Sequence, residues 1–212
     1  MRIRHLTRAA GAALLLAVSA AAHAAGPWFV RFGITHIAPN DDSDRPPLLA
    51  AGSKVSVEGD TGLSVAIGRF LTEHVAVEVL GALPFEHDIK GAGSIASLGT
   101  VATAKQLPPT VTLQYHFSPQ AAFSPYVGLG LNYTFFFDIE TKGALAGTSL
   151  DLDSSWGAAL QLGADFRLAG DWLGNVDVRW IDIDTEASGS ATGTFDVQID
   201  PWVVTVGVGR RF

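Results

Sequence analysis

The stretch from Trp202 to Phe212, WVVTVGVGRRF, decides the fold class of this 212-residue chain. Between Trp202 and Val208 the even positions are Trp, Val, Val and Val, while the odd positions carry Val, Thr and Gly. Strict alternation of this kind is typical of a β-strand, because successive side chains point to opposite faces of a sheet. One face of this strand is apolar along its whole length, and the rest of the sequence must indicate what covers it.

The first 24 residues have the features of a cleaved secretory signal. They start with basic residues, continue with a short apolar stretch and end on Ala22-His23-Ala24. We therefore expect a signal peptide at 1–24 and one mature domain at 25–212. The signal holds three of the 14 basic residues and none of the 21 acidic ones, so the mature domain carries 11 against 21, a net charge of −10. This balance disfavours nucleic acid as a partner.

The composition is apolar without a long apolar run. Mean hydropathy is +0.27, 17% of the residues are charged, and there is no cysteine to form a disulfide. After the signal, no segment has the roughly 18 to 20 uninterrupted apolar residues of a transmembrane helix. The apolar residues are instead spread through alternating segments.

Eight such segments are separated by clusters of Gly, Pro, Asp or Ser. We predict strands at 27–37, 62–70, 74–86, 109–117, 125–138, 154–168, 171–183 and 200–212. Every second connection is short, and the others are expected to be long loops that are polar or Gly-rich. This pattern predicts an all-β fold, an eight-stranded antiparallel up-and-down transmembrane β-barrel without free edges. The segment at 93–107, GSIASLGTVATAKQL, is the one stretch in which we expect a helical turn.

The spacing of aromatic residues indicates that lipid covers the apolar face. The lipid-facing band of a bacterial barrel is about 25 Å tall, and a tilted strand crosses it in roughly ten residues. Trp156 and Phe166 are ten residues apart, as are Trp202 and Phe212. We predict a lipid-interface girdle of Trp28, Trp156, Phe166, Trp172, Trp180, Trp202 and Phe212.

Residues of the opposite parity then face the barrel interior, where they are mostly small or polar. A soluble sandwich would show the reverse, because its apolar side forms the core. The expected interior charges are Arg31, Glu78, Asp165, Arg167, Asp177 and Arg179. They could line a polar pathway, or they could pair across a lumen that is just wide enough for side chains. We favour pairing, because buried charges need partners.

The sequence offers little for metal binding or catalysis. Asp151 with Asp153, and Asp182 with Asp184, each place two carboxylates on one strand face, where calcium could bind. Solvated acid pairs beside a long loop explain the same pattern. No histidine pair has the spacing of a zinc site, and no GxSxG motif occurs. We predict no metal, no cofactor and no enzyme.

Several segments resemble the outer membrane protein W family of Gram-negative bacteria, in order and at compatible spacing. They are LPPTVTLQYHF (107–117), PYVGLGLNYTFFFD (125–138), SWGAALQLGADF (155–166), WIDIDT (180–185) and DPWVVTVGVGRRF (200–212). The resemblance covers nearly the whole mature chain. It implies an eight-stranded outer-membrane barrel whose narrow, hydrophobic lumen passes or binds small hydrophobic molecules, with lateral exit into the membrane as one route.

Transferred to this chain, the resemblance places lumen or ligand-binding positions at Leu80, Glu78, Thr112, Asn132, Gln161, Asn175 and Arg179. Arg179 does not fit a hydrophobic lumen unless Glu78 or Asp177 pairs with it. Phe212 matches the terminal aromatic signal read by the outer-membrane assembly machinery, although Arg210 stands where a second aromatic is common.

The sequence leaves two functions open, with membrane lipids and lipopolysaccharide as neighbours in both. One is a narrow outer-membrane channel or receptor for small hydrophobic molecules. The other is a surface interaction protein whose loops bind host molecules, phage or lipopolysaccharide. We expect the outer membrane as the location, with both termini in the periplasm.

Overall fold

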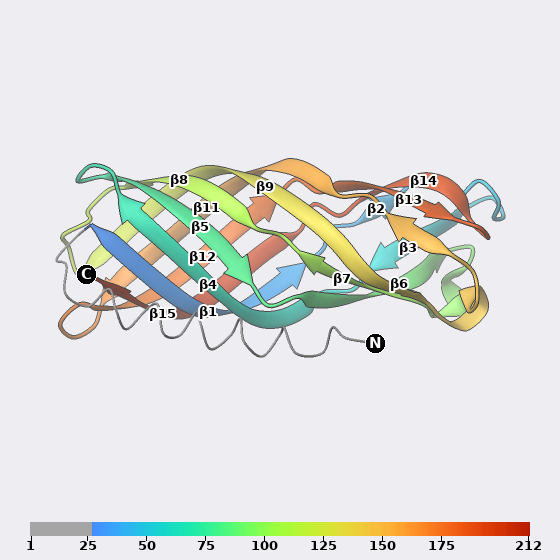
Figure 1. The fold of residues 1–212 in the computed structure, drawn as a ribbon, viewed down its shortest axis with the longest axis horizontal. Helices are drawn as coiled ribbons and strands as arrows, with labels where there is room; N and C mark the ends of the chain where they lie inside the picture. Colours follow the sequence, from blue (N-terminus) through green and yellow to red (C-terminus); the bar gives the residue numbers. More distant parts are fainter. Residues whose placement is uncertain (1–26) are drawn as a thin grey trace, which may run out of the picture.

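The computed structural model describes residues 27–212, which form a closed antiparallel β-barrel (Figure 1). The signal predicted at 1–24 lies outside the described residues. The barrel strands are β1 (Trp28–Ala38), β4 (Asp60–Phe70), β5 (Val75–Ala82), β8 (Thr110–His116), β9 (Phe123–Thr141), β11 (Ser155–Arg167), β12 (Trp172–Ile181) and β15 (Trp202–Arg211). Each pairs with the next in this order, and β15 pairs with β1 to close the ring. The predicted fold class is confirmed.

The predicted strand at 74–86 is wrong, because the chain forms two strands there. β5 ends at Ala82, and β6 (Phe85–Gly93) starts after Pro84. Proline has no backbone N–H, so it interrupts the hydrogen-bond ladder. Each of the other predicted strands matches an observed strand, and the predicted and observed ends differ by a few residues at most.

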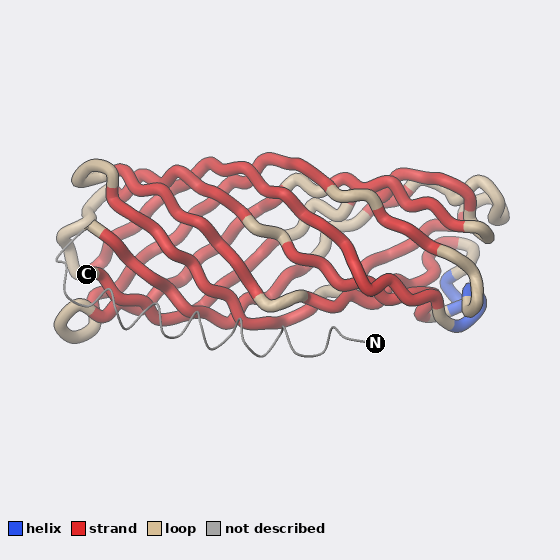
Figure 2. Tube along the Cα trace, viewed as in Figure 1, coloured by secondary structure: helices blue, strands red, loops and turns tan. Residues whose placement is uncertain are grey.

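The eight-stranded part continues into a second structured region at one end, which we call the extended end (Figure 2). It consists of the last part of β9 and of β2 (Asp42–Ser43), β3 (Ser53–Val57), β6, β7 (Thr100–Leu107), β10 (Leu150–Leu152), β13 (Asp184–Gly189) and β14 (Gly193–Gln198). It also holds two 3-10 helices, η1 (Ala96–Leu98) and η2 (Gly143–Leu145). The expected helical turn is η1, but the expectation of long loops is wrong for most of these segments.

Strand pairing explains why the extended end is ordered. β7 pairs with the last part of β9, and β6 and β3 follow in the same sheet. β10, β13, β14 and β2 form a four-stranded sheet of their own. Phe195 and Val197 on β14 are buried, so even this Gly-rich and Ser-rich part of the sequence has an apolar face to pack.

The opposite end carries the three short connections at 71–74, 117–122 and 168–171, and we call it the short-turn end. Trp28 and Phe212 meet there in two backbone hydrogen bonds. Trp28 N donates to Phe212 O at 3.1 Å, and Phe212 N donates to Trp28 O at 3.0 Å. β1 and β15 therefore remain hydrogen-bonded to each other as far as the short-turn end.

The remaining eight-stranded part, which we call the membrane belt, has its apolar side chains on the outside. Ile34 is 61% exposed, Leu129 63% and Val206 58%. Where the barrel strands enter the extended end, the apolar side chains point inward instead. Ile37 and Ile181 belong to a buried apolar cluster that continues into the extended end. Among residues 27–212, no helix has the length and apolarity needed to cross a membrane.

Candidate functional site

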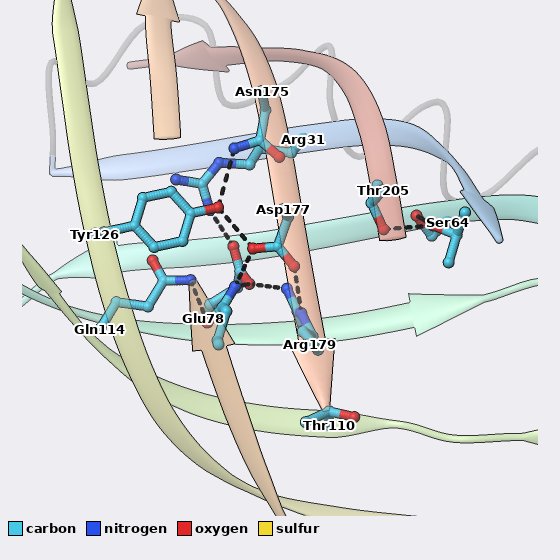
Figure 3. A network of polar contacts seen from close by, with 12 residues as sticks. Arg31, Ser64, Glu78, Thr110, Gln114, Tyr126, Asn175, Asp177, Arg179 and Thr205 are labelled. Carbon is cyan, nitrogen blue, oxygen red and sulfur yellow. Dashed lines mark hydrogen bonds and ion pairs between the residues drawn. The ribbon is translucent and has the colours of Figure 1, made fainter. Parts of the chain in front are cut away.

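The interior of the membrane belt holds a group of charged and polar side chains that we call the lumen network (Figure 3). At its centre is Glu78 on β5, which is fully buried. Its Oε2 atom pairs with Arg31 on β1, and its Oε1 atom accepts a hydrogen bond from Arg179 Nη2 on β12 at 2.7 Å. One carboxylate thus connects three strands, no two of which are neighbours in the barrel.

Two further carboxylates complete the ion pairs of the lumen network. Asp177 Oδ1 accepts a hydrogen bond from Arg179 Nε at 2.7 Å. Asp165 accepts from Arg31 Nε at 3.1 Å and Nη2 at 2.9 Å, and from Arg211 Nη2 at 3.1 Å. Three guanidinium groups face three carboxylates, so their formal charges cancel. The prediction that interior charges pair across the lumen is confirmed for these side chains.

Neutral polar side chains extend the lumen network by hydrogen bonds across the rest of the bore. Tyr126 OH donates to Asp177 Oδ2 at 2.8 Å, and Asn175 Nδ2 donates to the Tyr126 oxygen at 3.0 Å. Gln161 Nε2 donates to Asp177 Oδ2 at 2.5 Å, and Gln114 Nε2 donates to Gln161 Oε1 at 3.1 Å. The interior of an eight-stranded barrel is only wide enough for side chains. The lumen network therefore fills the bore of the membrane belt.

One predicted interior residue, Arg167, is wrongly placed by its parity. It is exposed, and its Nη2 donates to Gln120 O at 2.9 Å. Because Arg167 is the last residue of β11 at the short-turn end, its charge stays solvated. Arg211 supplies the third guanidinium instead. Sequence reasoning missed it, although it has the same parity as Val203 and Thr205.

All seven predicted lumen residues are buried inside the barrel, at 6% exposure or less. Glu78, Gln161, Asn175 and Arg179 belong to the lumen network. The other three, Leu80, Thr112 and Asn132, are buried on β5, β8 and β9. Their part in ligand binding stays a prediction. The lumen of the membrane belt is polar, in contrast to the hydrophobic lumen that the family resemblance implies.

The predicted girdle residues lie on the outer surface of the barrel. Trp28, Trp156, Phe166, Trp172 and Trp202 are between 42% and 73% exposed, and Trp180 and Phe212 are partly exposed. Trp156 also packs against Tyr133, with 4.6 Å between ring centroids. Their role at the lipid interface is a prediction that their exposure and spacing support.

The interior of the extended end contains an apolar cavity of about 50 Å³. β3, β6, β7, β9, β10, β13 and β14 contribute to its walls. Its apolar lining includes Val55, Ile89, Phe136, Leu152, Phe195 and Val197. Four polar side chains also line it, namely His87, Gln106, Thr185 and Thr192. Sequence reasoning did not find this site, because it treated most of these segments as loops.

The outer surface of the extended end is acidic. Partial burial and the nearby carboxylates of Asp182, Asp200 and Asp196 raise the pKa of Asp184. These acids include one of the two pairs considered for calcium. Within residues 27–212, no three His, Cys, Asp or Glu side chains are grouped as a metal ion would require.

A closed eight-stranded barrel with an apolar outside, aromatic borders and a polar filled inside is an integral protein of the bacterial outer membrane, in contact with lipid. The model of the OmpW family matches residues 24–212. The chain is 41% identical to outer membrane protein W of Vibrio cholerae, over 95% of this chain and 97% of that protein. It therefore belongs to the OmpW family.

Solved structures agree with this assignment. The crystal structure of OprG from Pseudomonas aeruginosa matches with a TM-score of 0.80 and 37% identity, over 90% of this chain and 97% of that chain. The solid-state NMR structure of outer membrane protein AlkL in DMPC bilayers matches with a TM-score of 0.69 and 30% identity, over 88% of this chain and 90% of that chain.

Proposed function

We propose that the protein is a narrow channel or receptor that brings small hydrophobic molecules through the outer membrane. The extended end would face the outside of the cell, because outer-membrane barrels have short turns on the periplasmic side. The observation that carries the proposal is the apolar cavity, which lies inside the extended end rather than on the lipid-facing surface. A hydrophobic molecule would leave water there before it reaches the bilayer.

The lumen network bears on the route of exit. A molecule that continued along the barrel axis would have to separate Glu78 from Arg31 and Arg179, and a broken buried ion pair costs about 3–5 kcal/mol. A sideways exit avoids this cost. Pro84 and the prolines at 108–109 interrupt the ladder in one part of the wall. We infer release into the bilayer through this part, with no turnover chemistry.

The name of one relative supports hydrophobic cargo. PahQ of Pseudomonas aeruginosa is 27% identical over 88% of this chain and 89% of that protein, and it is called a dibenzothiophene metabolism operon protein. Dibenzothiophene is an apolar aromatic compound. A cargo of the same kind would suit an apolar cavity.

Cavity filling tests the proposal. Ala187 is buried in the cavity wall on β13, and Thr194 is exposed on β14. In cells without another OmpW-family protein, we expect Ala187→Phe to lower the initial uptake rate of radiolabelled naphthalene several-fold. Thr194→Phe adds the same ring outside the cavity, so uptake should stay at the level of the unchanged chain. Equal uptake by both variants and by cells without the protein would refute the proposal.

A second candidate is a surface interaction protein, and the acidic outer face of the extended end favours it. Asp151, Glu186 and Asp196 are exposed on three neighbouring strands of the four-stranded sheet. Such a face could bind host molecules, phage or lipopolysaccharide while the barrel serves as an anchor. Shortening the turn at 189–193 separates the two functions. Lost adhesion with unchanged naphthalene uptake would support the second candidate. Recognition of Phe212 by the assembly machinery stays a prediction.

A further inference from the structure

Two arginines of the membrane belt point to its lipid-facing side near the short-turn end. Arg69 on β4 is exposed and has the same parity as the exposed Ile67. Arg210 on β15 has the same parity as the exposed Val208, and its side chain is 43% exposed. A guanidinium on the outside of a membrane barrel is unfavourable unless it reaches the lipid headgroups or an anionic partner. The surroundings of both arginines show that they lie at the level of the headgroups.

Strand register places each arginine directly opposite a tryptophan of the predicted girdle. Arg69 lies opposite Trp28 in the β1–β4 pair, and Arg210 lies opposite Trp172 in the β12–β15 pair. The two tryptophans are 43% and 50% exposed. Aromatic girdles mark the border between hydrocarbon and headgroups, so both arginines lie at the height of the lipid phosphates. We call Trp28, Arg69, Trp172 and Arg210 the rim patch.

The other border of the membrane belt, next to the extended end, has a different arrangement. There Trp156 lies opposite Tyr133, and Trp180 lies opposite Trp202. The tryptophans of that border therefore have aromatic residues as cross-strand neighbours. Because only the short-turn border combines its tryptophans with arginine in this way among these four, the general need for an aromatic girdle does not explain the rim patch.

The charges of the rim patch are loosely partnered within the protein. The guanidinium of Arg69 lies 5.5 Å from the ring centroid of Trp28. Within residues 27–212, no carboxylate lies within ion-pair distance of Arg69. Arg210 Nη2 is 3.9 Å from Asp171 Oδ2, and both side chains are exposed. Such a surface pair contributes little free energy, so both arginines can bind another anion.

The two arginines are close enough to share one anionic group. β4 and β15 are the two neighbours of β1, where Arg69 lies opposite Trp28 and Arg210 lies opposite Val30. Two strand spacings and an offset of two residues place the Cα atoms of the arginines roughly 12 Å apart. Two extended arginine side chains can cover this distance around a phosphate, which the guanidinium group binds with good geometry.

We propose that the rim patch binds the headgroup of an anionic phospholipid. The phosphodiester accepts hydrogen bonds from Arg69 and Arg210, and the acyl chains begin along Trp28 and Trp172. A zwitterionic lipid has the same phosphodiester, but its ammonium group would meet two guanidinium groups. Short turns of outer-membrane barrels lie on the periplasmic side, so the lipid comes from the periplasmic leaflet. This site is separate from the apolar cavity and does not depend on the proposed function.

Competition between two lipids tests the proposal on the full barrel by native mass spectrometry. Dioleoylphosphatidylglycerol and dioleoylphosphatidylcholine have the same acyl chains and differ in the headgroup. Each arginine near an anionic lipid strengthens binding about fivefold, so we expect a preference of roughly 20-fold for phosphatidylglycerol. Arg69→Gln should reduce this preference about fivefold. Arg167→Gln is the matched control, because Arg167 is an exposed arginine at the same end whose Nη2 donates to Gln120 O instead.

A second readout needs no variant. With ¹⁵N-labelled arginine in phosphatidylcholine nanodiscs, added phosphatidylglycerol should shift the side-chain signals of Arg69 and Arg210 but not that of Arg179 in the lumen network. Soluble glycerophosphoglycerol, the same headgroup without acyl chains, should shift none of them. Equal affinity for the two lipids, the same loss in Arg69→Gln and Arg167→Gln, or equal shifts with the soluble headgroup would each overturn the inference, while the proposed function would stand.

Discussion

The membrane belt and the extended end are made of the same kind of strand, yet their apolar side chains point in opposite directions. On β15, Val206 and Val208 are 58% and 48% exposed, whereas Phe195 and Val197 on β14 are 7% and 5% exposed. In the belt the apolar face meets acyl chains, and in the extended end it meets the interior of the protein itself. Alternation therefore identifies a strand, but the surroundings decide which of its faces is apolar.

The two regions should differ most in their ion pairs. Glu78 is buried between Arg31 and Arg179, while Glu58 pairs with Lys90 at the surface, where both are at least 38% exposed. We expect Glu78→Leu to lower the free energy of unfolding by about 3–5 kcal/mol, because two buried guanidinium groups lose a partner. Glu58→Leu should cost about 0–1 kcal/mol. Urea titration in lipid vesicles measures both, and equal effects would contradict a structural role of the lumen network.

A charge on the outer face should distinguish the two regions next. We expect Val206→Arg, in the membrane belt, to lower the free energy of unfolding by about 2–4 kcal/mol, because the guanidinium would face hydrocarbon. Thr194→Arg also points outward, but into water, so its effect should stay within about 0.5 kcal/mol. The same titration applies. If Val206→Arg lowered the free energy of unfolding only slightly, lipid would not cover β15.

Acid should weaken the extended end slightly around His87. Burial lowers the pKa of His87, and the hydrogen bond to the Glu58 carbonyl and the nearby carboxylate of Asp60 only partly oppose this. The unfolded segment therefore binds a proton more readily than the folded one, so the stability contributed by neutral His87 is present above the unfolded pKa near 6.5 and is lost as pH falls through the lowered pKa. Hydrogen-exchange protection factors should drop between pH 7.5 and 5 on β6 but not on β12. The variant His87→Phe should remove this difference, and protection that does not change with pH would contradict it.

The strands of the membrane belt could be predicted from the sequence because their two faces differ in composition and their aromatic residues are spaced by the height of the bilayer. The extended end could not. Its apolar residues are few and lie among Gly, Ser and Thr, so Phe195 and Val197 looked like parts of a loop. Their burial depends on sheets contributed by four distant connections, and a local pattern does not show this.

The side chains of the lumen network were largely predictable, but their partners were not. Parity alone puts Glu78, Asp177 and Arg179 inside. That Glu78 meets Arg31 as well depends on the stagger of the strands around the barrel, which brings β1 and β12 toward β5 across the bore. Tyr126 and Arg211 were missed for a related reason, since a single polar residue near a strand end can point either to the interior or to solvent. Arg167 points to solvent.

The hydrogen bonds between Trp28 and Phe212 connect the first and the last strand of the barrel along the chain. Phe29 lies opposite Arg211 in the β1–β15 pair, so the ring cannot close until β15 has been synthesised. Pairing between strands so far apart in the sequence is slow. Until it forms, the unpaired edges of β1 and β15 can hydrogen-bond to other copies of the chain. Closing the ring therefore also removes the two edges at which one copy of the chain could pair with another.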